Sequence, residues 1–268
     1  MQEYTKTDQQ LHWLSQLLAK NNRAFVPSKE DDSHTNLSFD SIGGRLFGRW
    51  IDGPDGPVIL TLNLQKRAFE WLDENQNSLD EVTVPEKSMK QLEEDVSRVP
   101  ESLKMKTDTL FSPLHFEIPD YGIESIGKGD LLDAGLQQWA FFRTLANEAC
   151  SDMLDFLQKE SEIRIWPHHF DTGIYAMATK QLGLGFGLAM KDAMVGAPYF
   201  YLSGYNQETP VSYKNLNPLT HGKWETGEHW NGAVLPLSAL EGFSKEKTGS
   251  MIQTFIREGI DWFLTNTP

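Results

Sequence analysis

Cysteine is almost absent from this sequence, which contains one such residue, Cys150, among 268. A single cysteine excludes an intramolecular disulfide, so packing must hold the fold together. A chain of this length buries about three quarters of the surface that its unfolded form exposes, which is enough for a sizeable core. Cys150 lies in a stretch of helical character and is expected to be a small buried apolar residue. A reactive thiol would need a partner base.

Long apolar runs are also missing, and no stretch of about 18 consecutive apolar residues occurs. The first residues, MQEYTKTDQQ, contain neither the basic segment nor the apolar segment of a secretory leader. Together these two features predict a cytoplasmic protein without a membrane span.

Positive charge is scarce, because 24 lysines and arginines face 38 acidic residues and give a formal net charge of −14. Binding to a phosphate backbone or to an anionic membrane depends on clustered lysine and arginine. We therefore expect neither nucleic acid nor membrane as a partner. The acidic runs at residues 30–32 and 93–95 lack the glycine-punctuated ligand spacing of a calcium loop, so they are expected to be solvated surface.

The short motifs of the common catalytic and cofactor sites are absent as well, since no HExxH, CxxC, GxSxG or P-loop pattern occurs. The run from Gly183 to Gly187 resembles a dinucleotide fingerprint, but Leu188 stands where the third glycine is needed. The sequence therefore identifies neither a cofactor nor a set of metal ligands. A zinc or iron site is chemically allowed if His169 acts together with ligands from a polar segment. That segment contains His221, Glu225, Glu228 and His229.

The sequence does contain apolar residues at helical and at strand spacing. Helices are predicted from Tyr4 to Asn22, from Pro85 to a stop at Pro100, from Leu132 to Phe156, and from Ser244 to the C-terminus. Strands are predicted at residues 45–51, 58–62, 68–72, 81–84, 110–118, 174–179, 182–190, 198–203 and 231–237.

This order of elements predicts an α+β fold in which antiparallel sheet meanders are backed by long amphipathic helices. Residues 205–229 are polar and are expected to form a long loop. We expect one domain over residues 1–268, with two similar lobes at 1–108 and 109–268 as the alternative. His12, beside a core Trp13 on the first helix, and His34, in a polar loop, are expected to be solvated.

Titratable groups are densest between Ile163 and Asp171. If this segment is extended, side chains alternate, so that His169 and Asp171 share one face and His168 points to the other. A carboxylate beside a histidine fixes the tautomer and leaves the second ring nitrogen free as a base. His169 and Asp171 are therefore the candidate catalytic pair. The alternative is a structural hydrogen-bonded pair, and Pro167 indicates a sheet edge or a bulge.

Five further residues are candidates for ligand binding. Tyr199 and Tyr201 share one face of their strand, where their hydroxyls could orient a substrate, although tyrosine pairs also stabilise ordinary sheets. The neighbouring glycine-rich strand leaves one face bare, and we expect an aromatic ring or a ligand to lie flat on it. The other three are Asp192, which follows the glycine-rich strand, and His229 and Trp230 of the polar loop.

Four motifs occur in order along the chain, and they are Glu117-Ile118-Pro119-Asp120, Trp166-Pro167-x-His169-Phe170-Asp171, Pro198-Tyr199-Phe200-Tyr201 and Gly232-Ala233-Val234-Leu235-Pro236. Together they resemble an uncharacterised bacterial family, a domain of unknown function of about this length. The resemblance covers residues 112–264 best and the N-terminal half only loosely. In that family the position of His168 is often acidic, which implies that His169 and Asp171 are the better candidates. The resemblance implies no activity.

The sequence thus predicts a pocket in the C-terminal meander that binds a small polar molecule, with acid/base or hydrolytic chemistry centred on His169 and Asp171. The alternative is a non-enzymatic structural or interaction module in which this pair is structural. Neither the ligand nor the oligomeric state follows from the sequence.

Overall fold

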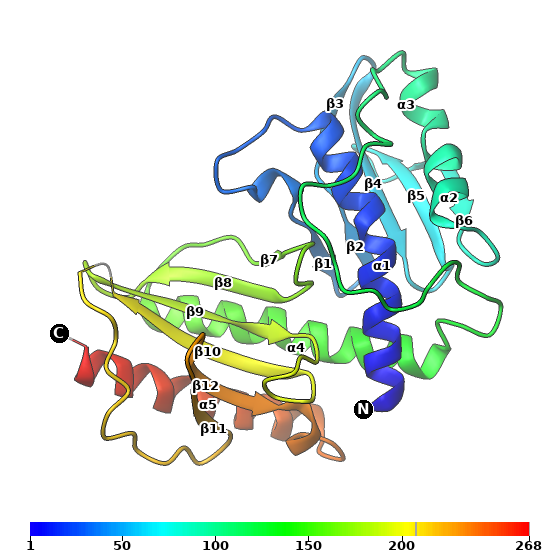
Figure 1. Ribbon diagram of the computed structural model, residues 1–268. Coiled ribbons are helices and arrows are strands. Elements are labelled where there is room, and N and C mark those ends of the chain that lie inside the picture. Colours follow the sequence, from blue (N-terminus) through cyan, green and yellow to red (C-terminus); the bar gives the residue numbers. More distant parts are fainter. Residues whose placement is uncertain (207, 268) are drawn as a thin grey trace. The chain divides into compact units, whose positions relative to one another are not determined.

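The computed structural model describes residues 1–206 and 208–267, which fold into two compact units. Unit 1 comprises Met1, Phe142–Arg164 and Asp171–Pro268, and unit 2 comprises Gln2–Phe141 and Ile165–Phe170. Each unit has an antiparallel sheet and helices, so the predicted α+β class is confirmed (Figure 1). The expectation of a single domain, or of lobes divided at residue 108, stays a prediction.

Unit 2 begins with the long helix α1 (Gln2–Phe25), which confirms the first predicted helix. The shorter helices α2 (Met89–Val96) and α3 (Arg98–Ser102) follow its sheet. Ser88 caps α2 in a capping box with Gln91, because each side chain bonds to the backbone N–H of the other. The predicted stop at Pro100 is wrong, since Pro100 lies in the first turn of α3, where its missing N–H costs no helical bond.

The sheet of unit 2 contains six short strands, in the order β1-β2-β4-β5-β6, with β3 paired to β4. Its buried apolar side chains include Leu60, Leu62, Phe69 and Trp71, and the Trp71 indole donates to Val96 O of α2 at 2.9 Å. Both predicted hairpins are present. The strands are β1 (Ser38–Asp40), β2 (Arg45–Phe47), β3 (Ile51–Gly53), β4 (Gly56–Asn63), β5 (Ala68–Asp73) and β6 (Ser78–Thr83).

The strand predicted at residues 110–118 is wrong, because this segment has no strand structure. Pro113 lies inside it and removes a backbone donor that a sheet ladder would need. The backbone carbonyls around this segment are used in another way, since the Arg23 guanidinium of α1 donates to Thr109 O at 2.6 Å and to Ser112 O at 2.9 Å.

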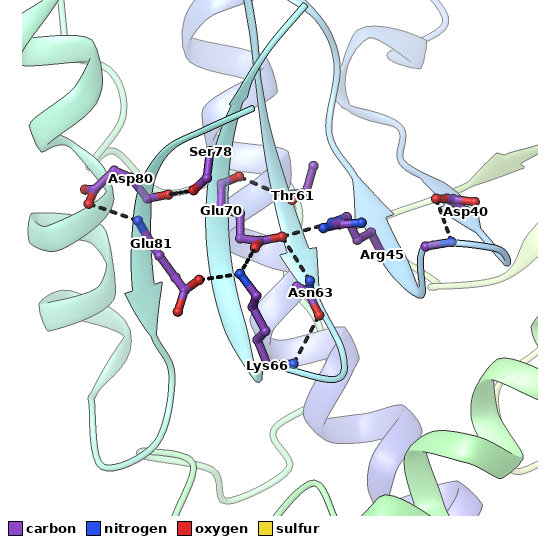
Figure 2. A network of polar contacts seen from close by, with 10 residues as sticks. Asp40, Arg45, Thr61, Asn63, Lys66, Glu70, Ser78, Asp80 and Glu81 are labelled. Atoms are coloured by element: carbon purple, nitrogen blue, oxygen red, sulfur yellow. Dashed lines mark hydrogen bonds and ion pairs between the residues drawn. The ribbon is translucent and has the colours of Figure 1, made fainter. Parts of the chain in front are cut away.

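An ionic network centred on the buried Glu70 crosses the sheet of unit 2 (Figure 2). Glu70 is 1% exposed, and its carboxylate accepts hydrogen bonds from Arg45 at 2.9 Å, Asn63 at 3.0 Å and Lys66 at 2.7 Å. Lys66 also pairs with Glu81 at 2.6 Å. Burial alone would raise the pKa of Glu70, but the bonds from Lys66, Arg45 and Asn63 outweigh burial and hold this pKa below its ordinary value.

The sheet of unit 1 is a meander whose strand order is β11-β12-β10-β9-β8, with the short β7 after β8. Its three central strands confirm the predicted meander, and α5 packs on β10 and β12. Figure 1 shows α5 and the C-terminal part of α4 along the same face of this sheet. The strands are β7 (Arg164–Ile165), β8 (Thr172–Met177), β9 (Leu182–Ala189), β10 (Tyr199–Asn206), β11 (Lys223–Thr226) and β12 (Asn231–Pro236).

Both long helices of the C-terminal half confirm the prediction. They are α4 (Asp133–Leu157) and α5 (Lys245–Asn266), and Ser244 caps α5 by accepting a hydrogen bond from Lys247 N at 3.3 Å. The long loop predicted at 205–229 is only partly correct, because it contains β11. The alternation of its few apolar residues was too sparse to predict that strand. No helix in the described part of the chain is both long and apolar enough to cross a bilayer.

Candidate functional site

The segment from Ile163 to Asp171 is not one extended strand. β7 ends at Ile165, and a tight turn follows in which the N–H groups of His169 and Phe170 donate to Trp166 O at 3.2 and 2.6 Å. Phe170 has a φ of +57°, a left-handed conformation that interrupts any alternation of side chains. The extended backbone expected here is therefore wrong beyond Ile165, and Pro167, at the start of the turn, is the physical reason.

The members of the predicted catalytic pair belong to different units. His169 is the penultimate residue of the 165–170 segment of unit 2, and Asp171 begins the long C-terminal segment of unit 1. His169 is exposed, and its ring lies 4.3 Å from that of His168 between centroids. His168 is half-buried and also packs on Phe116 and Trp166. The pairing of His169 with Asp171 stays a prediction.

A histidine that was expected to be solvated anchors this turn within unit 2. His12 of α1 is 1% exposed, and its Nε2 donates to Pro167 O at 2.9 Å. Since a carbonyl oxygen only accepts, Nε2 carries a proton, and in the neutral form of the ring Nδ1 accepts from the Tyr121 hydroxyl at 2.7 Å. Gln16, one turn later on the helix, donates to the same carbonyl at 2.8 Å. The expectation for His12 is thus wrong, because its partners lie more than a hundred residues away.

Phe170 is fully buried between two aromatic side chains of unit 2. Its ring stacks on His12 at 5.1 Å with an interplanar angle of 6°, and on Trp139 at 5.9 Å with an angle of 23°. The Trp139 indole in turn donates to Asp8 at 2.7 Å. The Trp-Pro-x-His-Phe motif therefore packs against α1 and the start of α4. His34 is likewise buried rather than solvated, and its Nδ1 accepts from Lys29 N at 3.3 Å.

Asp171 meets one of the predicted ligand-binding tyrosines in unit 1. The Tyr201 hydroxyl donates to Asp171 Oδ2 at 2.7 Å. The other carboxylate oxygen, Oδ1, is shielded from solvent and has no hydrogen-bond partner among the described residues. Next to it, Thr172 accepts at 2.8 Å from Arg143, a fully buried residue of α4.

Glycines let Tyr201 reach Asp171 over the intervening strand β9. A Cβ on Gly187 would lie 2.8 Å from the Tyr201 hydroxyl and 2.3 Å from Thr172 O, and a Cβ on Gly173 would lie 2.9 Å from the same hydroxyl. Along the same face, the Tyr175 ring covers Gly183. The prediction that aromatic rings lie on the glycine face is confirmed, and any larger residue at Gly187 would force Tyr201 away.

Tyr199 lies two residues before Tyr201 on the same face of β10 and forms a second tyrosine–carboxylate bond. Its hydroxyl donates to Asp192 Oδ2 at 2.7 Å. Asp192 is exposed, and its Oδ1 accepts from Met194 N at 3.0 Å and Val195 N at 2.9 Å, so both oxygens are occupied. This arrangement joins the loop after β9 to the start of β10.

The two tyrosines stay protonated. Burial, followed by the hydrogen bond to Asp192, raises the pKa of Tyr199, and burial together with the charge of Asp171 raises the pKa of Tyr201 well above its ordinary value. Burial also raises the pKa of Cys150, with Asp171 as the second cause, and the thiol is buried as predicted. The hydroxyls of Tyr199 and Tyr201 are therefore hydrogen-bond donors and not bases.

The remaining predicted residues lie at the turn between β11 and β12. His229 is exposed, and the Trp230 ring lies over Gly232, since a Cβ there would be 2.5 Å from the ring. Among the described residues, no three histidines, cysteines or carboxylates are grouped closely enough to hold a metal ion. The structure thus brings together Asp171, Tyr201, Tyr199 and Asp192.

Comparison of the chain with known protein families, with curated proteins and with solved structures finds no significant match. The resemblance to an uncharacterised bacterial family stays a prediction.

Proposed function

We propose that unit 1 binds a small polar molecule that carries a hydrogen-bond donor, and that Asp171 and Tyr201 hold it. The uneven use of the Asp171 carboxylate supports this most strongly, because Tyr201 occupies Oδ2 while Oδ1 is buried without a partner. A buried acceptor that is left unpaired costs about 1–3 kcal/mol. A hydroxyl or ammonium group on a ligand would remove that cost.

The neighbouring groups favour this ligand chemistry. Tyr201 presents a protonated hydroxyl that orients the carboxylate, and the glycines of β8 and β9 allow this hydroxyl to reach it. Tyr199, on the same face of β10, and its partner Asp192 form a second tyrosine–carboxylate pair beside the first. Acid/base or hydrolytic chemistry would need a base, for which exposed His169 is the predicted residue. A cytoplasmic location, and the exclusion of nucleic acid as a partner, belong to this proposal and rest on composition.

A structural function is the second candidate, and one observation favours it. The Tyr201–Asp171 bond joins β10 to the residue before β8 across the strand between them, which stabilises the sheet. In that case the substitution Asp171→Asn changes stability and nothing else.

A thermal-shift screen of metabolites and metal ions, followed by calorimetric titration of the hits, separates the two functions. We expect a hit that Asp171→Asn and Tyr201→Phe weaken at least tenfold, and that Asp155→Asn, an exposed carboxylate on α4, leaves unchanged. His169→Ala in the same screen tests whether the predicted base belongs to the site. A hit that binds Asp171→Asn as tightly as the parent protein would overturn the proposal.

A further inference from the structure

A hollow of about 330 Å³ lies on unit 1 beside α5, away from Asp171. One wall is a single face of α5, on which Glu258, Asp261 and Trp262 follow one another at helical spacing. The other wall is formed by Trp224 of β11 and the loop at residues 217–219. No part of this hollow contributes to the proposed site at Asp171.

The indoles of this hollow are fixed in orientation. The rings of Trp224 and Trp262 lie 4.7 Å apart between centroids, with an interplanar angle of 54°. The Trp224 N–H donates to Asn217 O at 2.8 Å, and the Trp262 N–H to Asn215 O at 3.4 Å. Since both N–H groups are committed to the loop, half-buried Trp224 offers the hollow its ring rather than a donor.

The charged side chains that line the hollow are all acidic. Its described lining includes the carboxylates of Glu258 and Asp261, and it includes no lysine, arginine or histidine. Glu258 is held in place, because Thr220 donates to it through N at 2.7 Å and through Oγ1 at 2.5 Å. Asp261 is exposed and has no ion-pair partner in the described part of the chain. By contrast, the lining of the hollow between α4 and α5 contains Arg257 as well as the carboxylates of Asp152 and Asp155.

We propose that the hollow at Trp224 binds a small organic cation of the alkylammonium class. An aromatic face attracts a cation through the ring quadrupole, and alkylated ammonium groups are suited to such faces because they are weakly hydrated. The carboxylates at the rim supply the opposite charge, and the net charge of −14 of the chain adds to the attraction.

Choline and its neutral carbon analogue test this proposal. Each is titrated into the full chain at constant ionic strength, and the indole N–H signals of Trp224 and Trp262, assigned with single Trp→Phe variants, are followed by NMR. We expect choline to shift both signals and to bind about tenfold more tightly than its analogue. Equal binding of the two molecules, or no shift at either indole, overturns the proposal.

Two exposed carboxylates provide a matched pair of variants that should not affect folding. Asp261→Asn should weaken choline binding about threefold, whereas Asp155→Asn, in the hollow that contains Arg257, should not change it. Unchanged binding in Asp261→Asn, or an equal loss in Asp155→Asn, contradicts a specific site. Asp171→Asn should retain choline binding, so this test and that of the Asp171 site succeed or fail separately.

Discussion

The hydroxyl of Tyr201 donates a hydrogen bond of 2.7 Å to Asp171 Oδ2 by passing over Gly187 of the strand between them. The bond occupies one carboxylate oxygen and leaves the other buried without a partner. The aspartate immediately before β8 and a tyrosine of β10 thereby become one polar group on the sheet face of unit 1.

Gly187→Ala should disrupt this arrangement. The added Cβ would lie 2.3 Å from Thr172 O, a backbone atom that cannot move aside cheaply. We expect the free energy of unfolding, measured in urea, to fall by about 2 kcal/mol or more. The matched control is Gly249→Ala in α5, where nothing lies within 4 Å of the added atom. Alanine there should stabilise the protein by about 0.5–1 kcal/mol. Equal effects at the two positions would contradict the close approach at Gly187.

Replacing His12 should cost far more stability than replacing His169. His12→Ala removes one buried and one partly buried hydrogen bond and the stack on Phe170, so we expect the free energy of unfolding to fall by about 2–4 kcal/mol. His169→Ala alters an exposed side chain and should change it by no more than about 0.5 kcal/mol. Chemical denaturation of both variants measures the difference. A large loss for His169→Ala would instead favour a structural function for that residue.

Replacing each of two neighbouring asparagines of α1 by leucine should change the free energy of unfolding in opposite directions. Asn21 is fully buried, and neither atom of its amide has a partner among the described residues. Asn21→Leu removes that unpaired amide and should raise the free energy of unfolding by about 1 kcal/mol. The amide of Asn22 accepts from Arg49 N at 2.8 Å and donates to Thr35 O at 3.2 Å, so Asn22→Leu should be destabilising by about 1–3 kcal/mol. Thermal unfolding of the two variants and of the parent protein measures both changes.

A fall in pH should lower the free energy of unfolding partly through protonation of Glu70. Its pKa in the folded protein lies below the ordinary value of 4.5, so its contribution to stability is complete above pH 4.5 and is lost as the pH falls through the folded pKa. Glu70→Gln should lower stability at neutral pH and make the unfolding free energy less steep with pH below 4.5. Urea titrations at several pH values measure the slope. An unchanged slope would mean that Glu70 has no such linkage.

Local patterns in the sequence were sufficient for much of the fold. The 3.6-residue spacing in α1, α4 and α5 and the short alternating runs of β8 to β10 predicted those elements, because burial on one face imposes a period. The segment at 110–118 alternates in the same way, yet it forms no strand, since Pro113 and the bonds from Arg23 take its backbone out of a sheet.

The candidate site was only partly predictable for a related reason. Asp171, Tyr199 and Tyr201 stood out as polar residues on short strands, and the glycines of β9 indicated an aromatic neighbour. The turn at Pro167–Phe170 was missed because its geometry depends on His12, whose partners are distant in sequence. The Trp224–Trp262 hollow was missed because two indoles 38 residues apart give no local signal.

Calorimetric titration of a thermal-shift hit into the parent protein and into Asp171→Asn tests the central claim most directly. Binding at Asp171 Oδ1 predicts that the variant binds at least tenfold more weakly and remains folded by circular dichroism, while Asp155→Asn binds like the parent. Equal affinity for the parent protein and for Asp171→Asn would contradict it.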